Sequence, residues 1–229
     1  MSTVPERWGG GSEPRPILPN VYPMVHPSAG AGEEEFPVER VAAAFRAFLE
    51  SLGLDLGDPN LVGTEHRVAR AYREMLGGLR SAEPRLSTFP NTKGYAGLVS
   101  VTDVPLYSIC SHHFLPFFGA AHLAYVPREC LVGLSKLARV IDFYARRPQL
   151  QEELTEQIAV FLDERLAPAG LIVSIEARHL CMEMRGVSRP GVTTRTTAVR
   201  GTLVGDEHLQ RQFFARIRGA GATARTRES

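Results

Sequence analysis

The fold is decided by residues 98–126, LVSVTDVPLYSICSHHFLPFFGAAHLAYV, which predict two β-strands separated by a short loop. Residues 98–107 are rich in β-branched and aromatic side chains, and residues 120–126 form a second apolar run that ends before Pro127. Both compositions favour strands. The tetrapeptide Cys110-Ser111-His112-His113 therefore lies in the connection of a predicted hairpin.

A second segment with reactive side chains, His179-Leu180-Cys181, lies far along the chain. Residues 172–185 alternate as a strand, and alternation places six side chains on one face if no bulge intervenes. These are Val173, Ile175, Ala177, His179, Cys181 and Arg185. We therefore expect one imidazole, one thiol and one guanidinium together at the end of this strand.

Cys110, His113 and Cys181 form a candidate set of metal ligands. Cys110 and His113 are three residues apart and can converge in one turn, and Cys181 completes a Cys₂His set. Thiolates favour zinc over magnesium or calcium. Three protein ligands leave the fourth tetrahedral position open for water, as in a catalytic zinc site. His112 and His179 then remain beside the metal as candidates for general acid and base, because imidazole titrates near neutral pH.

Two alternatives to a catalytic metal site stay open. A lone cysteine is usually a small buried hydrophobic residue, and a Cys-x-x-His pair by itself is a weak metal signal. A structural zinc site would take a fourth protein ligand, which Cys130 or His122 could supply.

Candidate anion ligands recur along the helix predicted at residues 128–146. Ser135, Lys136 and Arg139 fall within about one turn of it, and Arg185 can join them. Clustered cations with a hydroxyl suit a phosphate ester. The alternative is a solvated basic face.

Four further polar residues are candidates for binding a substrate. Arg67 and Arg70 lie three apart and share a helix face, for which a solvated surface is again the alternative. Gln151 and Glu152 open another predicted helix, and an amide with a carboxylate could bind the edge of a nucleobase such as guanine. Two polar residues in a first turn are also ordinary helix chemistry.

Composition predicts a soluble globular chain with one core. The 229 residues are 44% hydrophobic and 22% charged, close to ordinary globular proteins. A net charge of +1 offers no general attraction to nucleic acid or to a membrane surface, so we expect neither partner. With three cysteines, no run of 18 apolar residues and no visible secretory signal, we expect a cytoplasmic location.

The chain divides into four predicted segments with an α+β fold. They are a flexible Pro/Gly-rich arm (1–34), a helical segment (35–96), a domain with the sheet and the candidate site (97–218) and a flexible tail (219–229). Helical spacing of apolar residues predicts helices at residues 36–52, 64–76, 128–146 and 149–167. A second hairpin is expected at residues 172–185 and 193–203. This order favours an antiparallel sheet with helices packed on one face.

An ordered series of motifs over residues 36–218 resembles GTP cyclohydrolase I. The motifs are Cys110-Ser111-His112-His113 with Phe114-Leu115-Pro116-Phe117, Gly133-Leu134-Ser135-Lys136-Leu137-Ala138-Arg139, Arg147-Pro148-Gln149-Leu150-Gln151-Glu152, His179-Leu180-Cys181-Met182 and Met184-Arg185-Gly186. Such a series is far more specific than any one motif.

The resemblance implies a tunnelling fold that assembles into a toroidal homodecamer with active sites at subunit boundaries. It also implies an enzyme that converts GTP to 7,8-dihydroneopterin triphosphate and formate, in the synthesis of folate and related pterins. It implies zinc ligation by Cys110, His113 and Cys181 and proton transfer by His112 and His179. It also implies a triphosphate site and a guanine site. The triphosphate site would comprise Ser135, Lys136, Arg139 and Arg185, joined by Arg67 and Arg70 of a neighbouring subunit, and the guanine site Gln151 and Glu152.

Three positions depart from the pattern of that family. Ser111 stands where the family usually has glutamate, Glu65 where it usually has proline, and Arg195 interrupts a run that is typically threonine and serine. None of these departures removes a proposed ligand. They leave room for a paralogue serving a specialised pathway such as deazapurine synthesis, or for a silent nucleotide-binding member.

Overall fold

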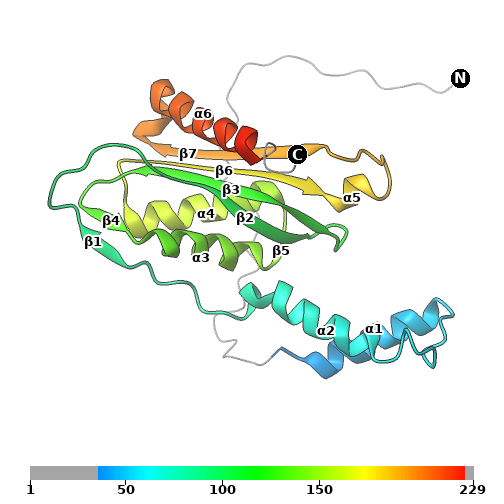
Figure 1. Cartoon of the computed structure of the whole chain (residues 1–229). Helices are drawn as coiled ribbons and strands as arrows, with labels where there is room; N and C mark the ends of the chain where they lie inside the picture. The colour runs from blue at the N-terminus through cyan, green and yellow to red at the C-terminus, as the bar shows by residue number, and fades with distance from the viewer. Residues whose placement is uncertain (1–35, 225–229) are drawn as a thin grey trace, which may run out of the picture. The chain divides into compact units, whose positions relative to one another are not determined.

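The computed structural model describes the backbone of residues 36–224 and the side chains of residues 36–217 (Figure 1). The helices are α1 (Val38–Ser51), α2 (Thr64–Met75), α3 (Leu134–Ala145), α4 (Gln151–Leu166), α5 (Leu180–Glu183) and α6 (Glu207–Ala224). The strands are β1 (Thr88–Pro90), β2 (Val99–Cys110), β3 (Pro116–Val126), β4 (Cys130–Val132), β5 (Pro148–Gln149), β6 (Gly170–His179) and β7 (Thr193–Gly201). Two short 3-10 helices, η1 (Gly77–Leu79) and η2 (Thr202–Val204), complete the described part. The arm predicted at residues 1–34 lies outside it.

A five-stranded sheet in the order β5-β2-β3-β6-β7 forms the centre of the fold. The four long strands are antiparallel, as expected, and the two-residue strand β5 pairs in parallel with the end of β2. In this register Phe117 of β3 lies opposite His179 of β6. The sheet thus brings the end of β6 beside the start of β3, next to the loop that follows Cys110.

The main core lies between the sheet and the helices α3 and α4. Residues at helical spacing on α4, including Leu154, Ile158 and Leu162, are fully buried against alternate residues of β6 such as Val173 and Ile175. Leu137 and Ile141 of α3 belong to the same buried cluster. Alternate strand residues therefore face these two helices, as the period-two pattern predicted.

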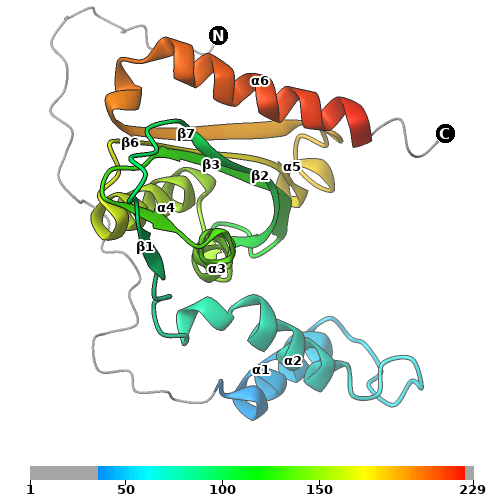
Figure 2. The ribbon, with the colours of Figure 1, turned by 60° about the vertical axis from the view of Figure 1, so that its left-hand side comes forward.

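Helices cover both faces of the sheet, which corrects the expectation that they pack on one face. Figure 2 shows α6 on the opposite side of the sheet from α3 and α4. Phe213 and Ile217 of α6 are buried against Ala124 of β3 and Ile172 of β6. No helix was predicted there, and α6 continues to Ala224, into the segment predicted as a tail.

Two predicted elements have different bounds in the structure. The helix expected at residues 128–146 is divided: Cys130–Val132 forms β4, which pairs with β1, and α3 begins only after Gly133, whose backbone is extended. The strand expected at residues 172–185 ends at His179, and Cys181 lies in the single turn α5. Leu131 and Leu134 are three apart and fit a helical pattern, but the β-branched Val132 favours a strand and Gly133 disfavours a helix that runs through it.

Helices α1 and α2 pack against each other in the N-terminal segment. His66 of α2 lies with Nε2 3.2 Å from Oε2 of Glu39 on α1. Beyond α2, the buried Arg147 donates from Nε to the carbonyl oxygen of Gly78 at 3.1 Å, with its guanidinium over the Phe143 ring. The described residues 36–224 belong to one compact unit.

Within residues 36–224, no helix has the length and apolar character needed to cross a membrane.

Candidate active site

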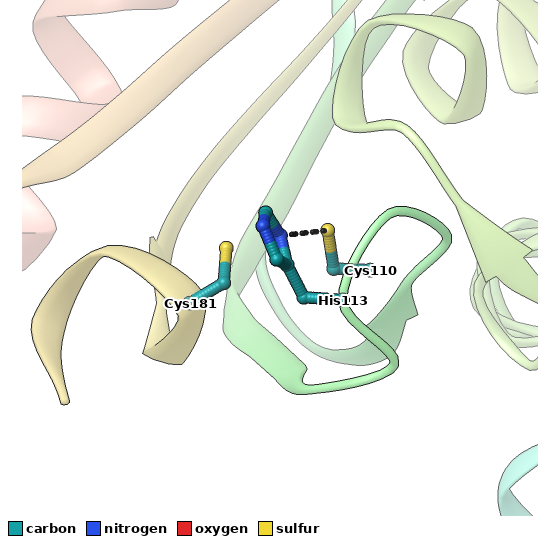
Figure 3. A group of neighbouring side chains, drawn as sticks. All are labelled: Cys110, His113 and Cys181. Atoms are coloured by element: carbon teal, nitrogen blue, oxygen red, sulfur yellow. Dashed lines mark hydrogen bonds between the residues drawn. The ribbon is translucent and has the colours of Figure 1, made fainter. Parts of the chain in front are cut away.

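The structure brings Cys110, His113 and Cys181 together, as the sequence predicted. Their ligand atoms, two Sγ and one imidazole nitrogen, all lie within 4.8 Å of one another. Figure 3 shows the His113 ring between the two sulfur atoms, and Cys110 Sγ is 4.0 Å from His113 Nδ1. Cys110 is buried, Cys181 is half-buried and His113 is exposed. Such a group of soft and borderline donors matches the ligand set of zinc.

A tight backbone turn after β2 positions Cys110 and His113. The amide of Phe114 donates to the carbonyl of Cys110 at 2.8 Å, and the amide of Cys110 donates to the carbonyl of Leu115 at 2.8 Å. Phe114 adopts a left-handed backbone with φ of 55°, which closes this turn. The amide of Ser111 donates to the carbonyl of Gln149 at 3.0 Å, which ties the loop to β5.

The electrostatics of the two cysteines favour a bound cation. Burial raises the pKa of the Cys181 thiol, and the nearby Cys110 thiol raises it further. Two thiols this close cannot both ionise easily without a positive charge between them. A divalent cation supplies that charge and stabilises both thiolates, so the residues present fit zinc.

The two residues considered as a fourth protein ligand lie outside this group. Nδ1 of His122 accepts a hydrogen bond from the Asp103 amide at 3.1 Å, and Cys130 Sγ lies 3.8 Å from the carbonyl oxygen of Leu166. Among the described residues, the group that could hold a metal contains three members. Three donors are the number expected when the fourth position is left to solvent.

His112 and His179 flank the ligand set in sequence but have different surroundings. His112 is exposed in the loop, with its ring centroid 6.2 Å from that of His113 and nearly perpendicular to it. His179 ends β6, stacks on Phe117 with centroids 4.7 Å apart, and lies with Nε2 2.8 Å from Oε1 of Gln151. Burial lowers the pKa of the His179 imidazole, and the negative charge of Glu152 opposes that effect. Because burial has the larger influence, we expect this ring to be neutral at neutral pH.

The candidate anion ligands lie on α3 and after α5, and three of the four are exposed. Ser135 and Arg139 are exposed and Lys136 is half-buried, while Arg185 is exposed in the segment that follows Met184. Solvent exposure leaves these cations available to a phosphate.

The candidates on α2 and α4 differ in how far they are already engaged. Arg67 and Arg70 are both exposed, and Arg67 donates to the carbonyl of Val62 at 2.8 Å and to Oγ1 of Thr64. On α4, Glu152 is exposed but Gln151 is only 2% exposed.

The sequence patterns did not identify Phe117 as part of the site, although strand alternation gives a signal for it. Phe117 is fully buried, and alternation along β3 places it on the same face of the strand as Gly119, two residues on. The hydroxyls of Thr155 and Thr196, which lie next to Gln151, could not be recognised in the sequence. Their contacts depend on how β7 packs against α4.

Most of the chain matches known proteins. Residues 41–218 match the family model described as GTP cyclohydrolase I. The chain is 44% identical over 191 residues to a GTP cyclohydrolase 1 of Corynebacterium glutamicum, covering 82% of this chain and 97% of that protein. It is 50% identical over 164 residues to that of Carboxydothermus hydrogenoformans, covering 71% and 85%, and 46% identical over 182 residues to that of Thermobifida fusca, covering 79% and 88%.

Proposed function

Because the chain belongs to the GTP cyclohydrolase I family and is an enzyme of that type, we propose that it opens the imidazole ring of GTP with zinc held by Cys110, His113 and Cys181. The products of the proposed reaction are formate and 7,8-dihydroneopterin triphosphate. The observation that carries the proposal is the convergence of three donor atoms within 4.8 Å from segments about 70 positions apart.

The zinc site is supported by the chemistry of its donors. Cys110 and Cys181 supply thiolates and His113 a neutral imidazole nitrogen, which is a ligand set of catalytic zinc. When bound, zinc supplies Lewis acidity and lowers the pKa of water, which is the chemistry needed for hydrolysis at a purine carbon. The protein fixes Cys110 and His113 through the turn that follows β2, and α5 carries Cys181.

Two histidines carry the proposed proton transfers. His112 and His179 flank the metal ligands, and neither belongs to the group of three. Protonation at N7 of the purine makes C8 electrophilic, and an imidazole that titrates near neutral pH can deliver that proton and later accept another. Ring opening, loss of formate and rearrangement of the ribose all require such transfers.

The proposed phosphate site comprises Ser135, Lys136, Arg139 and Arg185, with Arg67 and Arg70 of a neighbouring subunit. The exposed cations on α3 and after α5 support the first part of this assignment. Fixing the triphosphate would also fix the base relative to the metal, which lowers the entropic cost of reaction.

The family resemblance assigns the guanine to Glu152 and Gln151; Glu152 is the exposed one of the two, and it is the side chain that we propose to contact the base. We further propose a toroidal homodecamer in the cytoplasm. The supporting observation for the assembly is the family membership, since a tunnelling-fold sheet closes with copies of itself.

The test is release of formate from GTP by the purified, zinc-loaded protein, with the pterin detected by fluorescence after oxidation. Cys181→Ser is expected to lose both zinc and turnover. Cys130→Ser is the matched control, because this cysteine lies outside the ligand group, and it should retain both. GTP binding without formate release by zinc-loaded protein would overturn the proposal.

A further inference from the structure

The side-chain amide of Gln151 is buried and fully engaged within the protein. Gln151 is the first residue of α4 and is only 2% exposed. Its Nε2 lies 3.0 Å from the carbonyl oxygen of Ile175, 3.0 Å from that of Thr194, and 3.1 Å from Oγ1 of Thr196. Its Oε1 lies 2.8 Å from Nε2 of His179.

These contacts determine which end of the amide faces His179. Two of the three atoms around Nε2 are backbone carbonyl oxygens, of Ile175 and Thr194, and these can only accept hydrogen bonds. A flipped amide would place Oε1 against both carbonyls and leave buried acceptors facing each other, which is costly. The nitrogen therefore belongs on the sheet side and the oxygen on the side of His179.

A chain of hydroxyls gives the same orientation independently. Thr155 donates from Oγ1 to the backbone carbonyl of Gln151 at 2.8 Å, so its single proton is used. The 2.6 Å contact between Thr155 and Thr196 must then be a bond donated by Thr196. With its own proton committed, Oγ1 of Thr196 can only accept from Gln151.

The orientation of the amide assigns the proton on His179. Because Oε1 of Gln151 has no proton, Nε2 of His179 must be the donor of the 2.8 Å bond. In the neutral ring the lone pair is then on Nδ1. The plane of the ring is fixed as well, because Phe117 stacks against it at 4.7 Å with an interplanar angle of 7°.

We propose that Gln151 is a positioning residue that holds His179 in the Nε2–H tautomer, so that Nδ1 is the nitrogen that exchanges protons with the substrate. The proposal rests on the proposed function, in which His179 transfers protons. It also gives the Gln151 side chain a different task from contact with guanine, since both amide hydrogens are already shared among three acceptors. The neighbouring Glu152 is left as the side chain on this turn that can bind the base.

The kinetic test separates positioning from substrate binding in the zinc-loaded enzyme. Gln151→Met should lower kcat by about 100-fold, the contribution of a well-placed proton-transfer group, while KM for GTP and zinc content stay within about threefold. The preference for GTP over inosine triphosphate, which lacks the 2-amino group, should also be unchanged. A rise in KM with loss of that preference would show that Gln151 binds the base and would overturn the proposal.

A double-mutant cycle tests whether Gln151 acts through His179. The kcat of His179→Ala should be the same, within about twofold, as that of His179→Ala combined with Gln151→Met. A further tenfold fall in the double variant would mean that Gln151 acts separately, and the proposal would fail. Gln157→Met is the matched control on the same helix, where Gln157 accepts from Gln149, and its kcat should stay within about twofold of wild type.

A spectroscopic readout keeps the inference separate from turnover. Solid-state ¹⁵N NMR of histidine-labelled protein should show a neutral ring protonated at Nε2, assigned to His179 by its loss in His179→Gln. That signal should shift towards a tautomer mixture in Gln151→Met, or in Thr196→Val should the first variant fail to fold. A ring protonated only at Nδ1 in wild type would refute the assignment, whereas an inactive wild type with the Nε2–H signal would refute only the proposed function.

Discussion

Substitution of Phe117 tests how much this buried ring, which contacts both the core and His179, contributes to the free energy of unfolding. Phe117 is fully buried between the sheet and the helices and stacks on His179. Phe117→Leu keeps most of the apolar volume, so repacking costs up to about 1.5 kcal/mol. Loss of the aromatic pair adds about 0.5–1.5 kcal/mol. The expected loss in the free energy of unfolding is therefore about 0.5–3 kcal/mol for Phe117→Leu, and about 3–5 kcal/mol for Phe117→Ala.

Urea denaturation at one fixed protein concentration measures this loss. With a slope of about 3 kcal/mol/M, a loss of 2 kcal/mol moves the midpoint down by roughly 0.7 M without changing the slope. The control is Phe118→Leu, because the next side chain points to the opposite face and is only half-buried; it should cost less than about 1 kcal/mol. If Phe117→Leu costs no more than Phe118→Leu, the burial of Phe117 and its stacking on His179 do not contribute to stability as expected.

Three further substitutions test the packing and the acid stability. Gly119→Ala would press its Cβ into a backbone carbonyl oxygen of β6, so we expect little folded protein on circular dichroism, whereas Gly205→Ala has nothing within 4 Å and should fold normally. Phe213→Ala removes a fully buried ring from the core under α6 and should cost about 3–5 kcal/mol in urea denaturation. Burial lowers the pKa of His122 below 6.5, and its neutral ring accepts a hydrogen bond from the Asp103 amide. The neutral ring therefore contributes its full stability above pH 6.5, and this stability is lost as the pH falls below 6.5. His122→Gln should therefore show a shallower loss of unfolding free energy than wild type between about pH 7.5 and about pH 5.5, and equal slopes would contradict this.

Local sequence patterns were enough to predict the two strands that flank Cys110 and His113. Cys110 and His113 were expected to converge because they are three residues apart in one turn, and the structure confirms this. Cys181 was placed correctly beside them for a partly wrong reason. The predicted strand ends at His179, and a single helical turn, α5, rather than strand alternation brings Cys181 to the group.

Features that depend on distant pairing could not be predicted from the sequence. Strand β4 exists because Cys130–Val132 pairs with β1, and residues 128–146 alone favour a helix. The role proposed for Gln151 depends on two backbone carbonyls, one in β6 and one in β7, which lie 24 and 43 residues further along the chain. Only the pairing of these strands in the sheet brings both carbonyls next to Gln151. A first-turn glutamine gives no sign of such contacts in the sequence.

X-ray absorption at the zinc edge of the purified enzyme tests the central claim most directly. The account predicts one zinc per chain with two sulfur ligands at about 2.3 Å, one imidazole nitrogen at about 2.0–2.1 Å and one further light donor from solvent. Three sulfur ligands would place Cys130 in the coordination shell and make the site a closed structural one. That result, or a shell without sulfur, would contradict the hydrolytic role assigned to Cys110, His113 and Cys181.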